Sequence, residues 1–324
     1  MQSIVVFAAA LCLVSGLGCR LVAFGNSLTD DGRSPIKGDP YGMQRYSNGP
    51  TWPIYLAKML KCNPFVMAHS GGLSGQGNIG FSGWSGTAWQ ADEFLKEQGG
   101  QVAPDQIVAM EPGAVNDFCL VTDAIRENKP IPARAPVSHA TRLTDLVDGI
   151  VNNNLNSVKK LLQAGLKKLI FFDIFAFQKY APFANEAKFL PFRADYIAAL
   201  EQCNNKLRQG IADLKKQYPD AFIVYINMDG FWDLATKRFP NHVDPFSYEK
   251  EDLQIGEQEQ SIWFDFWHML TDAHLLVAEV AHKAWLRGGD VDAAGAAGGN
   301  GQNGYTQPQS KVANISQVQY CDSL

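Results

Sequence analysis

Short apolar runs alternate with longer amphipathic segments through the middle of the chain. The short runs contain mostly β-branched and aromatic residues, which is typical of buried strands; they cover residues 20–24, 65–68, 106–110, 168–172 and 222–226. In the longer segments apolar residues recur every three or four positions, which predicts helices; these cover residues 51–61, 89–97, 142–164, 193–218 and 268–285. Strands joined through helices need crossover connections, and crossovers produce a parallel sheet with helices on both faces. The pattern therefore predicts an α/β fold, a three-layer α/β/α sandwich, with its active site at the carboxyl ends of the strands.

The two ends of the chain lack this alternation. Residues 1–19 contain an apolar run from Ile4 to Val14 followed by small residues, which predicts a secretory signal peptide; the alternative is a buried first element of the mature protein. The run is shorter than the roughly 20 residues that span a bilayer, so we expect no stable membrane insertion. Residues 288–324 are rich in Gly, Ala, Asn and Gln, which predicts a flexible tail. One domain, residues 20–287, is expected between these ends.

Composition and charge narrow the function classes. With 324 residues, 46% of them hydrophobic, the chain can bury a large core and is not disordered as a whole. The 28 basic and 33 acidic side chains give a net charge of -5, so no basic field exists to attract nucleic acid. We therefore expect no nucleic-acid partner.

Four cysteines lie beyond the predicted leader: Cys62, Cys119, Cys203 and Cys321. They can form two disulfides in three alternative pairings, which fits a secreted protein. Asn314 begins a glycosylation sequon, which has meaning only if a eukaryote secretes the chain.

Two candidate chemical groups lie at opposite ends of the domain. Ser27 directly follows the first predicted strand, and Gly25 before it permits an unusual backbone turn, so Ser27 can be an exposed nucleophile. The alternative is that Ser27 caps a helix. His268 is a candidate base, because Asp265 lies one helical turn earlier and can orient the imidazole ring. Ser27, Asp265 and His268 thus form a candidate triad.

Four short segments carry these residues in order. They are Phe24-Gly25-Asn26-Ser27-Leu28-Thr29-Asp30, Ser70-Gly71-Gly72, Gly113-Ala114-Val115-Asn116-Asp117 and Asp265-Phe266-Trp267-His268. Together they resemble blocks one, two, three and five of the GDSL-type lipases and esterases of the SGNH hydrolase superfamily. The stretch 46–57 is similar to the one that follows block one in the phospholipase, haemolysin and acyltransferase branch. The chain departs from the family pattern where Asn26 replaces the usual Asp and Met269 replaces a proline, and in a longer third block.

The resemblance implies the SGNH hydrolase fold, with a flavodoxin-like parallel sheet, and an ester-cleaving mechanism without cofactor or metal. Ser27 would attack the ester carbonyl, His268 would accept its proton, and Asp265 would hold the productive tautomer of His268. The oxyanion would be bound by the backbone N–H groups of Ser27 and Gly71 and the side-chain amide of Asn116. Gly72 is the second choice for the glycine.

The expected function is therefore that of a secreted serine esterase or lipase, acting on carboxylic esters through an acyl-enzyme, with acyl transfer as a side activity. Lipid or phospholipid acyl esters are the expected substrates. The alternatives are a carbohydrate acetylesterase of the same superfamily, and a secreted binding protein that retains the fold without turnover.

Other motifs have simpler interpretations. Residues 75–80 fit a dinucleotide-binding pattern, but the residues after them cannot open a helix, so we expect a loop at the cleft. Trp84 and Trp89 in or after this loop are either acyl contacts or ordinary packing residues. His242 and Asp244 lack the ligand spacing of a zinc site.

The acidic residues of the blocks are expected to stiffen loops. Asp30, Asp31 and Asp117 are predicted to act as turn and cap groups, and not as proton carriers.

Overall fold

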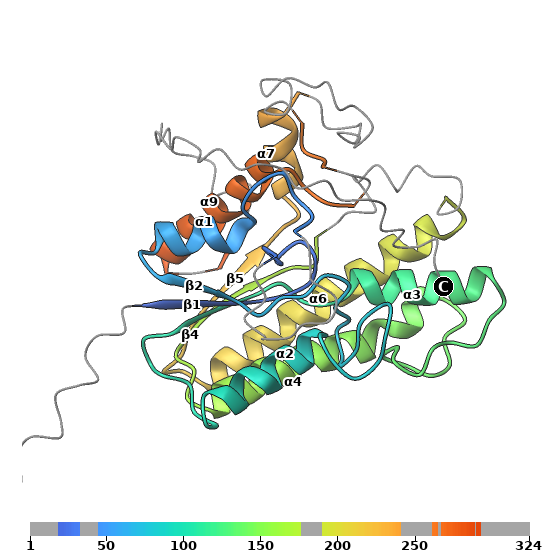
Figure 1. The fold of residues 1–324 in the computed structure, drawn as a ribbon, viewed down its shortest axis with the longest axis horizontal. Coiled ribbons are helices and arrows are strands. Elements are labelled where there is room, and N and C mark those ends of the chain that lie inside the picture. Colours follow the sequence, from blue (N-terminus) through green and yellow to red (C-terminus); the bar gives the residue numbers. More distant parts are fainter. Residues whose placement is uncertain are drawn as a thin grey trace, which may run out of the picture.

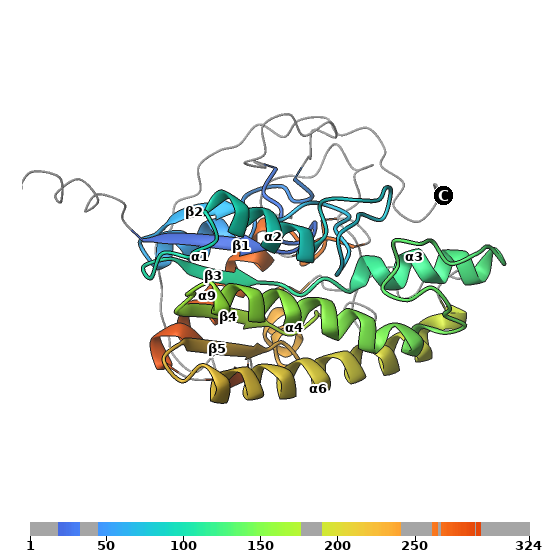
Figure 2. The same ribbon diagram turned by 90° about the horizontal axis from the view of Figure 1, so that it is seen from below.

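Six parallel strands form a single sheet in the order β2-β1-β3-β4-β5-β6, and Figure 2 shows the first five in succession. The computed structural model describes residues 19–32, 45–175, 190–240, 261–264, 267–288 and 290–292. The strands are β1 (Arg20–Phe24), β2 (Asn63–Val66), β3 (Ile107–Met110), β4 (Lys168–Phe172), β5 (Phe222–Asn227) and β6 (Val291–Asp292). The first five follow the flavodoxin-like order, so the predicted parallel sheet is confirmed.

Helices cover both faces of the sheet, which confirms the predicted three-layer sandwich (Figures 1 and 2). One face carries α1 (Trp52–Met59), α7 (Phe231–Arg238) and α9 (Thr271–Arg287). The other carries α2 (Thr87–Glu97), α4 (Val147–Gln163) and α6 (Arg193–Gln217). Helix α3 (Val115–Arg126) lies beyond the carboxyl end of β3, and the short 3-10 turns η1 (Leu143–Leu146) and η3 (Leu190–Phe192) precede α4 and α6.

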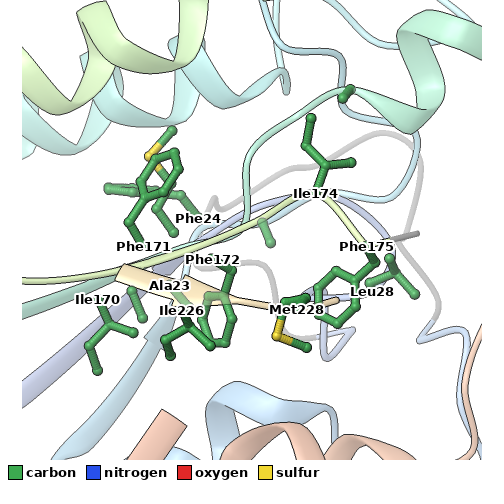
Figure 3. Packing of buried hydrophobic residues seen from close by; sticks show 14 of the residues in the cluster. Ala23, Phe24, Leu28, Ile170, Phe171, Phe172, Ile174, Phe175, Ile226 and Met228 are labelled. Atoms are coloured by element: carbon green, nitrogen blue, oxygen red, sulfur yellow. The ribbon is translucent and has the colours of Figure 1, made fainter. Parts of the chain in front are cut away.

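The central strands are buried on both faces, as parallel strands between helices must be. Successive side chains point to opposite faces, so Phe171 and Phe172 of β4 enter different halves of the core (Figure 3). Phe172 packs against Trp52 of α1, with ring centroids 4.8 Å apart. Phe24 of β1 packs against Phe94 of α2 on the other face, at 5.7 Å. This core fixes the strand ends from which the site loops emerge.

All ten elements predicted from the sequence pattern are present, with shifted ends in most cases. The strand expected at 65–68 lies at Asn63–Val66, and the helix expected at 142–164 divides into η1 and α4. The last helix begins at Thr271, so His268 precedes it instead of lying on it.

Three elements were not predicted: α3, α7 and β6. Helix α3 has nine consecutive buried residues, and four of them are polar, so its polar positions do not mark an exposed face. Strand β6 lies within the stretch 288–324, which was expected to be flexible; Val291 pairs with Ile226, and Asp290 Oδ1 accepts a hydrogen bond from Tyr225 N at 2.9 Å. The predicted tail therefore begins too early, and its remainder, with Asn314 and Cys321, lies outside the described residues.

One disulfide joins Cys19 to Cys62, across 43 residues of sequence. It links the residue before β1 to the residue before β2, at the amino ends of both strands. Cys119 and Cys203 are buried free thiols. The predicted pairing among four cysteines is thus wrong: Cys62 bonds to Cys19, which the sequence analysis had assigned to the leader.

None of the helices in the described ranges is both long and apolar enough to cross a bilayer.

Candidate active site

Ser27 and His268 meet at the carboxyl end of β1. Ser27 lies on a turn closed by hydrogen bonds from Thr29 N and Asp30 N to Asn26 O, at 3.0 and 2.9 Å. Ser27 Oγ and His268 Nε2 are 2.8 Å apart, a hydrogen-bond distance, although the two residues are 241 positions apart in sequence. Both side chains are largely buried, with 7% and 5% of their surface exposed. A hydroxyl in hydrogen-bond contact with an imidazole is the arrangement by which a base activates a nucleophile.

The alternative role for Ser27 was to cap a helix. Residues 27–29 form a turn that no helix follows within the described residues up to 32. The capping interpretation is therefore not supported.

His268 is held by its backbone and by a neighbouring ring. Its carbonyl oxygen accepts a hydrogen bond from Phe264 N at 2.8 Å, and Met269 forms an antiparallel bridge with Trp263. The ring of Tyr46 stacks on the imidazole, with centroids 4.7 Å apart and planes 23° apart. Asp265, the third member of the predicted triad, lies outside the described residues.

The segment that contains Tyr46 also holds the start of α9. Asn48 Oδ1 accepts a hydrogen bond from Thr271 N, and Thr271 Oγ1 donates to Pro50 O, both at 2.8 Å. Residues 46–50 therefore contact both the imidazole and the first turn of the helix that follows it. This is part of the stretch that resembles the phospholipase branch, for which the sequence analysis assigned no role.

The loop after β2 places Gly71 in a conformation that only glycine adopts easily. Its φ is +75°, and a Cβ atom there would lie 2.6 Å from Asn78 Oδ1. Asn78 Nδ2 fixes the loop by donating to Ser70 O at 2.7 Å, and Ile79 N donates to Gly71 O at 2.8 Å.

The hydrogen bonds of this loop separate the two glycine candidates. Gly72 N donates to His69 O at 3.0 Å. Over the described ranges, neither Ser27 N nor Gly71 N donates to a protein acceptor. The geometry thus favours Gly71 over Gly72 as the second backbone donor of an oxyanion hole.

Asn116 lies in the first turn of α3. Its Nδ2 atom donates to Gly72 O at 2.9 Å, which ties α3 to the loop after β2. A side-chain amide has two N–H groups, so one remains for an oxyanion. The structure thus brings Asn116 and the Gly71 loop together, while their oxyanion role stays a prediction.

Two buried carboxyl groups brace the same loops. Asp30 Oδ2 accepts hydrogen bonds from both Ser70 N and Ser70 Oγ at 2.9 Å. Asp117 accepts from Ser74 N at 2.8 Å and from Ser74 Oγ at 3.0 Å. Burial raises the pKa of Asp30 and that of Asp117 to about 7, although these hydrogen bonds lower it. Both residues thus have the predicted structural role; Asp31 is buried beside them.

Other polar residues of the site were missed or left without a role. Gln90 binds both backbone polar groups of Gly25: its Oε1 accepts a hydrogen bond from Gly25 N at 3.0 Å, and its Nε2 donates one to Gly25 O at 2.7 Å. Glu111 is buried directly after β3, and its Oε2 accepts from Thr29 Oγ1 at 2.5 Å. An acidic residue immediately after an apolar strand was the only signal in the sequence for Glu111.

The two tryptophans of the following segment belong to an aromatic cluster. Trp84 and Trp89 are half-buried, and their rings lie 5.3 and 5.8 Å from that of His69. Residues 75–80 form a loop with no helix after it until α2, which agrees with the rejection of a dinucleotide site. An acyl-binding role for Trp84 and Trp89 stays a prediction.

His274 of α9 is fully buried, and burial lowers its pKa to about 3. His242 and Asp244 lie outside the described residues. Within the described ranges, no group of three or more His, Cys, Asp or Glu side chains is arranged to hold a metal ion.

Solved structures of similar arrangement come from several esterases. Est24, a carbohydrate acetylesterase from Sinorhizobium meliloti, has 11% identity and a TM-score of 0.46, over 83% of this chain and 99% of that one. Phospholipase A1 from Streptomyces albidoflavus NA297 has 12% identity and a TM-score of 0.39, over 79% and 94%. A carbohydrate esterase family 2 enzyme from Corynascus thermopiles has 16% identity and a TM-score of 0.40, over 88% and 68%.

No curated protein matches the chain. The sequence does match the model of one protein family, over residues 21–281, a range that includes every predicted site residue. Because that match covers most of the chain, this protein belongs to the family of GDSL-like lipases and acylhydrolases.

Proposed function

We propose that this protein is a secreted serine esterase that hydrolyses carboxylic esters through an acyl-enzyme intermediate. The observation that carries the proposal is the 2.8 Å contact between Ser27 Oγ and His268 Nε2. A buried imidazole in contact with a serine hydroxyl at the carboxyl edge of a parallel sheet is the arrangement that acyl transfer needs.

In the proposed mechanism His268 Nε2 accepts the Ser27 proton while Ser27 Oγ attacks the ester carbonyl carbon. The resulting oxyanion accepts hydrogen bonds from Ser27 N, Gly71 N and Asn116 Nδ2. The intermediate collapses, and the protonated His268 gives its proton to the departing alcohol. Water then attacks the acyl group on Ser27, again with His268 as base. Asp265 is proposed to bind the second ring nitrogen of His268.

The oxyanion donors are held in place before substrate binds, since Asp30, Asn78 and Asp117 fix the loops that carry them. Donors that need no reorganisation stabilise developing charge most effectively, and the loss of one costs about 3 kcal/mol of transition-state stabilisation. Among the described residues, Ser27 N and Gly71 N have no protein acceptor, which supports this part of the proposal.

We propose lipid or phospholipid acyl esters as the substrates, with acyl transfer to an alcohol as a side activity. Support comes from the segment 46–50, which resembles the phospholipase branch and contacts both His268 and α9. A carbohydrate acetylesterase is the competing candidate. A panel of esters of increasing acyl length, assayed beside acetylated sugars, distinguishes the two: a preference for acetyl-xylan over long acyl chains rejects the lipid proposal.

We also propose that the chain is exported, with a leader that ends before Cys19. The disulfide supports export, because such bonds persist mainly in oxidising compartments. It also moves the predicted boundary, since Cys19 bonds to the folded domain and must be retained. Amino-terminal sequencing of the exported protein is expected to begin between residues 17 and 19; an intact Met1 contradicts the proposal.

Labelling with a fluorophosphonate probe tests the serine mechanism without knowledge of the substrate. The wild-type protein should be labelled, and Ser27→Ala should not. Ser82→Ala is the matched control, because Ser82 is exposed on the 75–86 segment and should not affect labelling. Wild-type protein that stays unlabelled would favour the binding-protein alternative.

A further inference from the structure

Three carboxamide side chains hold loops at the carboxyl edge of the sheet by the same pair of hydrogen bonds. In each pair the amide oxygen accepts from the backbone N–H of one loop residue, and the amide nitrogen donates to the carbonyl oxygen of that same residue. We call this arrangement an amide clamp. The pairs are Gln90 with Gly25 (3.0 and 2.7 Å), Asn154 with Gly113 (3.0 and 2.9 Å) and Asn204 with Ile174 (2.9 and 3.1 Å).

The three amide clamps follow the order of the sheet. They are carried by α2, α4 and α6, which lie side by side on one face (Figure 2). The clamped residues lie just beyond the carboxyl ends of β1, β3 and β4, which are neighbours in the sheet. Each helix thus holds one loop at the edge where Ser27 and His268 meet.

The clamping side chains are buried. Gln90 and Asn154 have no exposed surface, and Asn204 has 5%. Buried backbone N–H and C=O groups need hydrogen-bond partners, and each amide supplies two of them to its loop. An amide suits this task, because it holds a donor and an acceptor side by side without carrying charge.

Two of the clamped residues precede proposed oxyanion donors. Gly25 lies two residues before Ser27, and Gly113 lies three residues before Asn116. A Cβ atom at Gly113 would lie 2.7 Å from Ser74 Cα, so this backbone also packs directly against the loop after β2. A change in either clamp therefore acts on the backbone that carries a proposed donor.

Gln90 also binds the loop after β2. Its Nε2 donates a second hydrogen bond to Ser85 O at 2.8 Å. Ser85 Oγ accepts one from Asn78 Nδ2 at 2.8 Å, and Asn78 Nδ2 also donates to Ser70 O. One buried amide therefore connects the turn of the proposed nucleophile to the loop that carries Gly71.

The third amide clamp holds a loop without proposed chemistry. Ile174 follows β4, and no residue assigned to the triad or to the oxyanion hole lies between β4 and β5 in sequence. Asn204 therefore provides an internal comparison. It makes the same pair of hydrogen bonds from the same layer of helices, but to a loop that carries none of the proposed reacting groups.

We propose that Gln90 and Asn154 are positioning residues that set the placement of the oxyanion donors relative to one another. Gln90 holds the Ser27 turn against the loop of Gly71, and Asn154 holds the start of the segment that carries Asn116. The inference rests on the proposed function, since the placement of these donors matters only if Ser27 reacts. Both amides act through the loop backbone, and donors placed in advance stabilise developing charge without reorganisation.

The test replaces each clamping amide by the acid of the same shape, in the variants Gln90→Glu, Asn154→Asp and Asn204→Asp. The acid keeps the oxygen that accepts from the loop N–H, but it places a second oxygen against the loop carbonyl, so each clamp loses one hydrogen bond. The measurements are the melting temperature, kcat and KM for p-nitrophenyl acetate, and the rate of labelling by a fluorophosphonate.

All three variants should lose stability to a similar extent, about 2–8 °C in melting temperature, because each leaves a buried carbonyl oxygen without its donor. Well below the melting temperature, Gln90→Glu and Asn154→Asp should lower kcat and the labelling rate at least about tenfold, with KM within about threefold of wild type, since the displaced donors act mainly in the transition state. Asn204→Asp should keep kcat within about twofold of wild type, because a loss of stability alone does not change the rate of the folded protein.

The inference is overturned if kcat of either Gln90→Glu or Asn154→Asp matches that of Asn204→Asp, because the amide clamps would then be purely structural. An acidic variant that does not fold is replaced by the apolar variant of similar shape, Gln90→Met, Asn154→Leu or Asn204→Leu, which is judged in the same way. Wild-type protein that neither is labelled nor hydrolyses the ester contradicts the proposed function and the inference with it. Active wild-type protein without a difference among the variants contradicts the inference alone.

Discussion

Around Ser27 the loops are joined by buried carboxyl and amide side chains, whereas around His268 the chain is held by backbone pairing and one aromatic ring. On the nucleophile side, Asp30 and Asp117 each bond to the backbone of the loop after β2, and Asn78 bonds to Ser70 O within that loop. On the base side, Phe264 N binds the His268 carbonyl oxygen, and Tyr46 stacks on the imidazole.

The difference shows how each side of the site is expected to respond to change. A buried polar network leaves an unsatisfied group when any partner is removed, which costs about 1–3 kcal/mol for each group. Aromatic stacking is worth less and has weaker demands on geometry, about 0.5–1.5 kcal/mol beyond burial. On the Ser27 side, activity and stability should therefore change when a single hydrogen-bonding group is removed or titrated. On the His268 side, activity should depend on whether an aromatic ring is present at position 46.

Removal of the base should have the largest effect. We expect His268→Ala to slow ester hydrolysis about 10⁴-fold, because His268 Nε2 is the proposed acceptor of the Ser27 proton and lies 2.8 Å from Ser27 Oγ. Steady-state hydrolysis of an activated ester measures the loss. His139→Ala, which changes an exposed imidazole, is the control and should leave the rate unchanged. A loss of less than a hundredfold would show that His268 is not the base.

Loss of one proposed oxyanion donor on the Ser27 side should have the second largest effect on activity. Asn116→Ala is expected to lower kcat about 10²- to 10³-fold with a smaller change in KM, because its amide is proposed to bind the oxyanion only in the transition state. Asn153→Ala is the matched control, since Asn153 Nδ2 donates to Ser74 Oγ at 3.1 Å without a role in the chemistry. Equal losses in the two variants would assign Asn116 to loop structure alone.

Loss of the Tyr46 ring beside His268 should slow the reaction less than loss of the Asn116 amide. Tyr46→Leu removes the stack on His268 and should lower kcat about threefold to tenfold, the rate equivalent of one aromatic pair. Tyr46→Phe keeps the ring and should remain within about twofold of wild type. If the two substitutions have the same effect, the hydroxyl group and not the ring supports His268.

The last predicted effect is on stability, and it depends on the ionisation of a buried carboxyl group on the Ser27 side of the site. Burial raises the pKa of Asp117 from 3.8 to about 7, so between these values the folded protein binds more protons than the unfolded chain. Stability from this group is present below pH 4 and is lost as the pH rises to 7. Asp117→Asn should flatten this decline by at most about 1.4 kcal/mol per pH unit. Urea unfolding across this range measures the slope.

The control for this prediction is Asp213→Asn. Asp213 lies on the surface with 47% of its side chain exposed, and the hydrogen bond from Lys216 lowers its pKa, so its titration cannot produce a decline in stability between pH 4 and 7. A slope that is unchanged in Asp117→Asn would mean that Asp117 stays ionised in the folded protein.

The sequence predicted most of the sheet because its strands are buried on both faces and contain β-branched and aromatic residues. It did not predict α3, whose polar residues are mostly buried together with the apolar ones, nor β6, whose two residues lie in a polar stretch. The disulfide was missed because spacing cannot select partners, and Cys19 lay within the predicted leader.

The candidate site was predictable where a short motif sets the chemistry. Ser27 and His268 were placed correctly as contact partners, and Gly71 and Asn116 as neighbours in one loop system. The supporting residues were not predictable, since Glu111, Gln90 and Tyr46 act through contacts between distant segments. Which polar side chain contacts which turn depends on the three-dimensional fold and cannot be read from the sequence.

The separation of 241 residues between Ser27 and His268, the proposed nucleophile and base, also determines when their contact can form. A ribosome that adds about 5–20 residues per second needs roughly 10 to 50 seconds to pass from Ser27 to His268. Throughout that time the loops that carry the proposed oxyanion donors can form, but the proposed proton acceptor of Ser27 has not yet been synthesised. The final contact forms only when α9 docks on α1, where Tyr55 Oη and Thr271 Oγ1 are 2.7 Å apart. A partly synthesised chain is therefore expected to be unreactive toward esters, and activity in a refolding sample reports the arrival of the last helix.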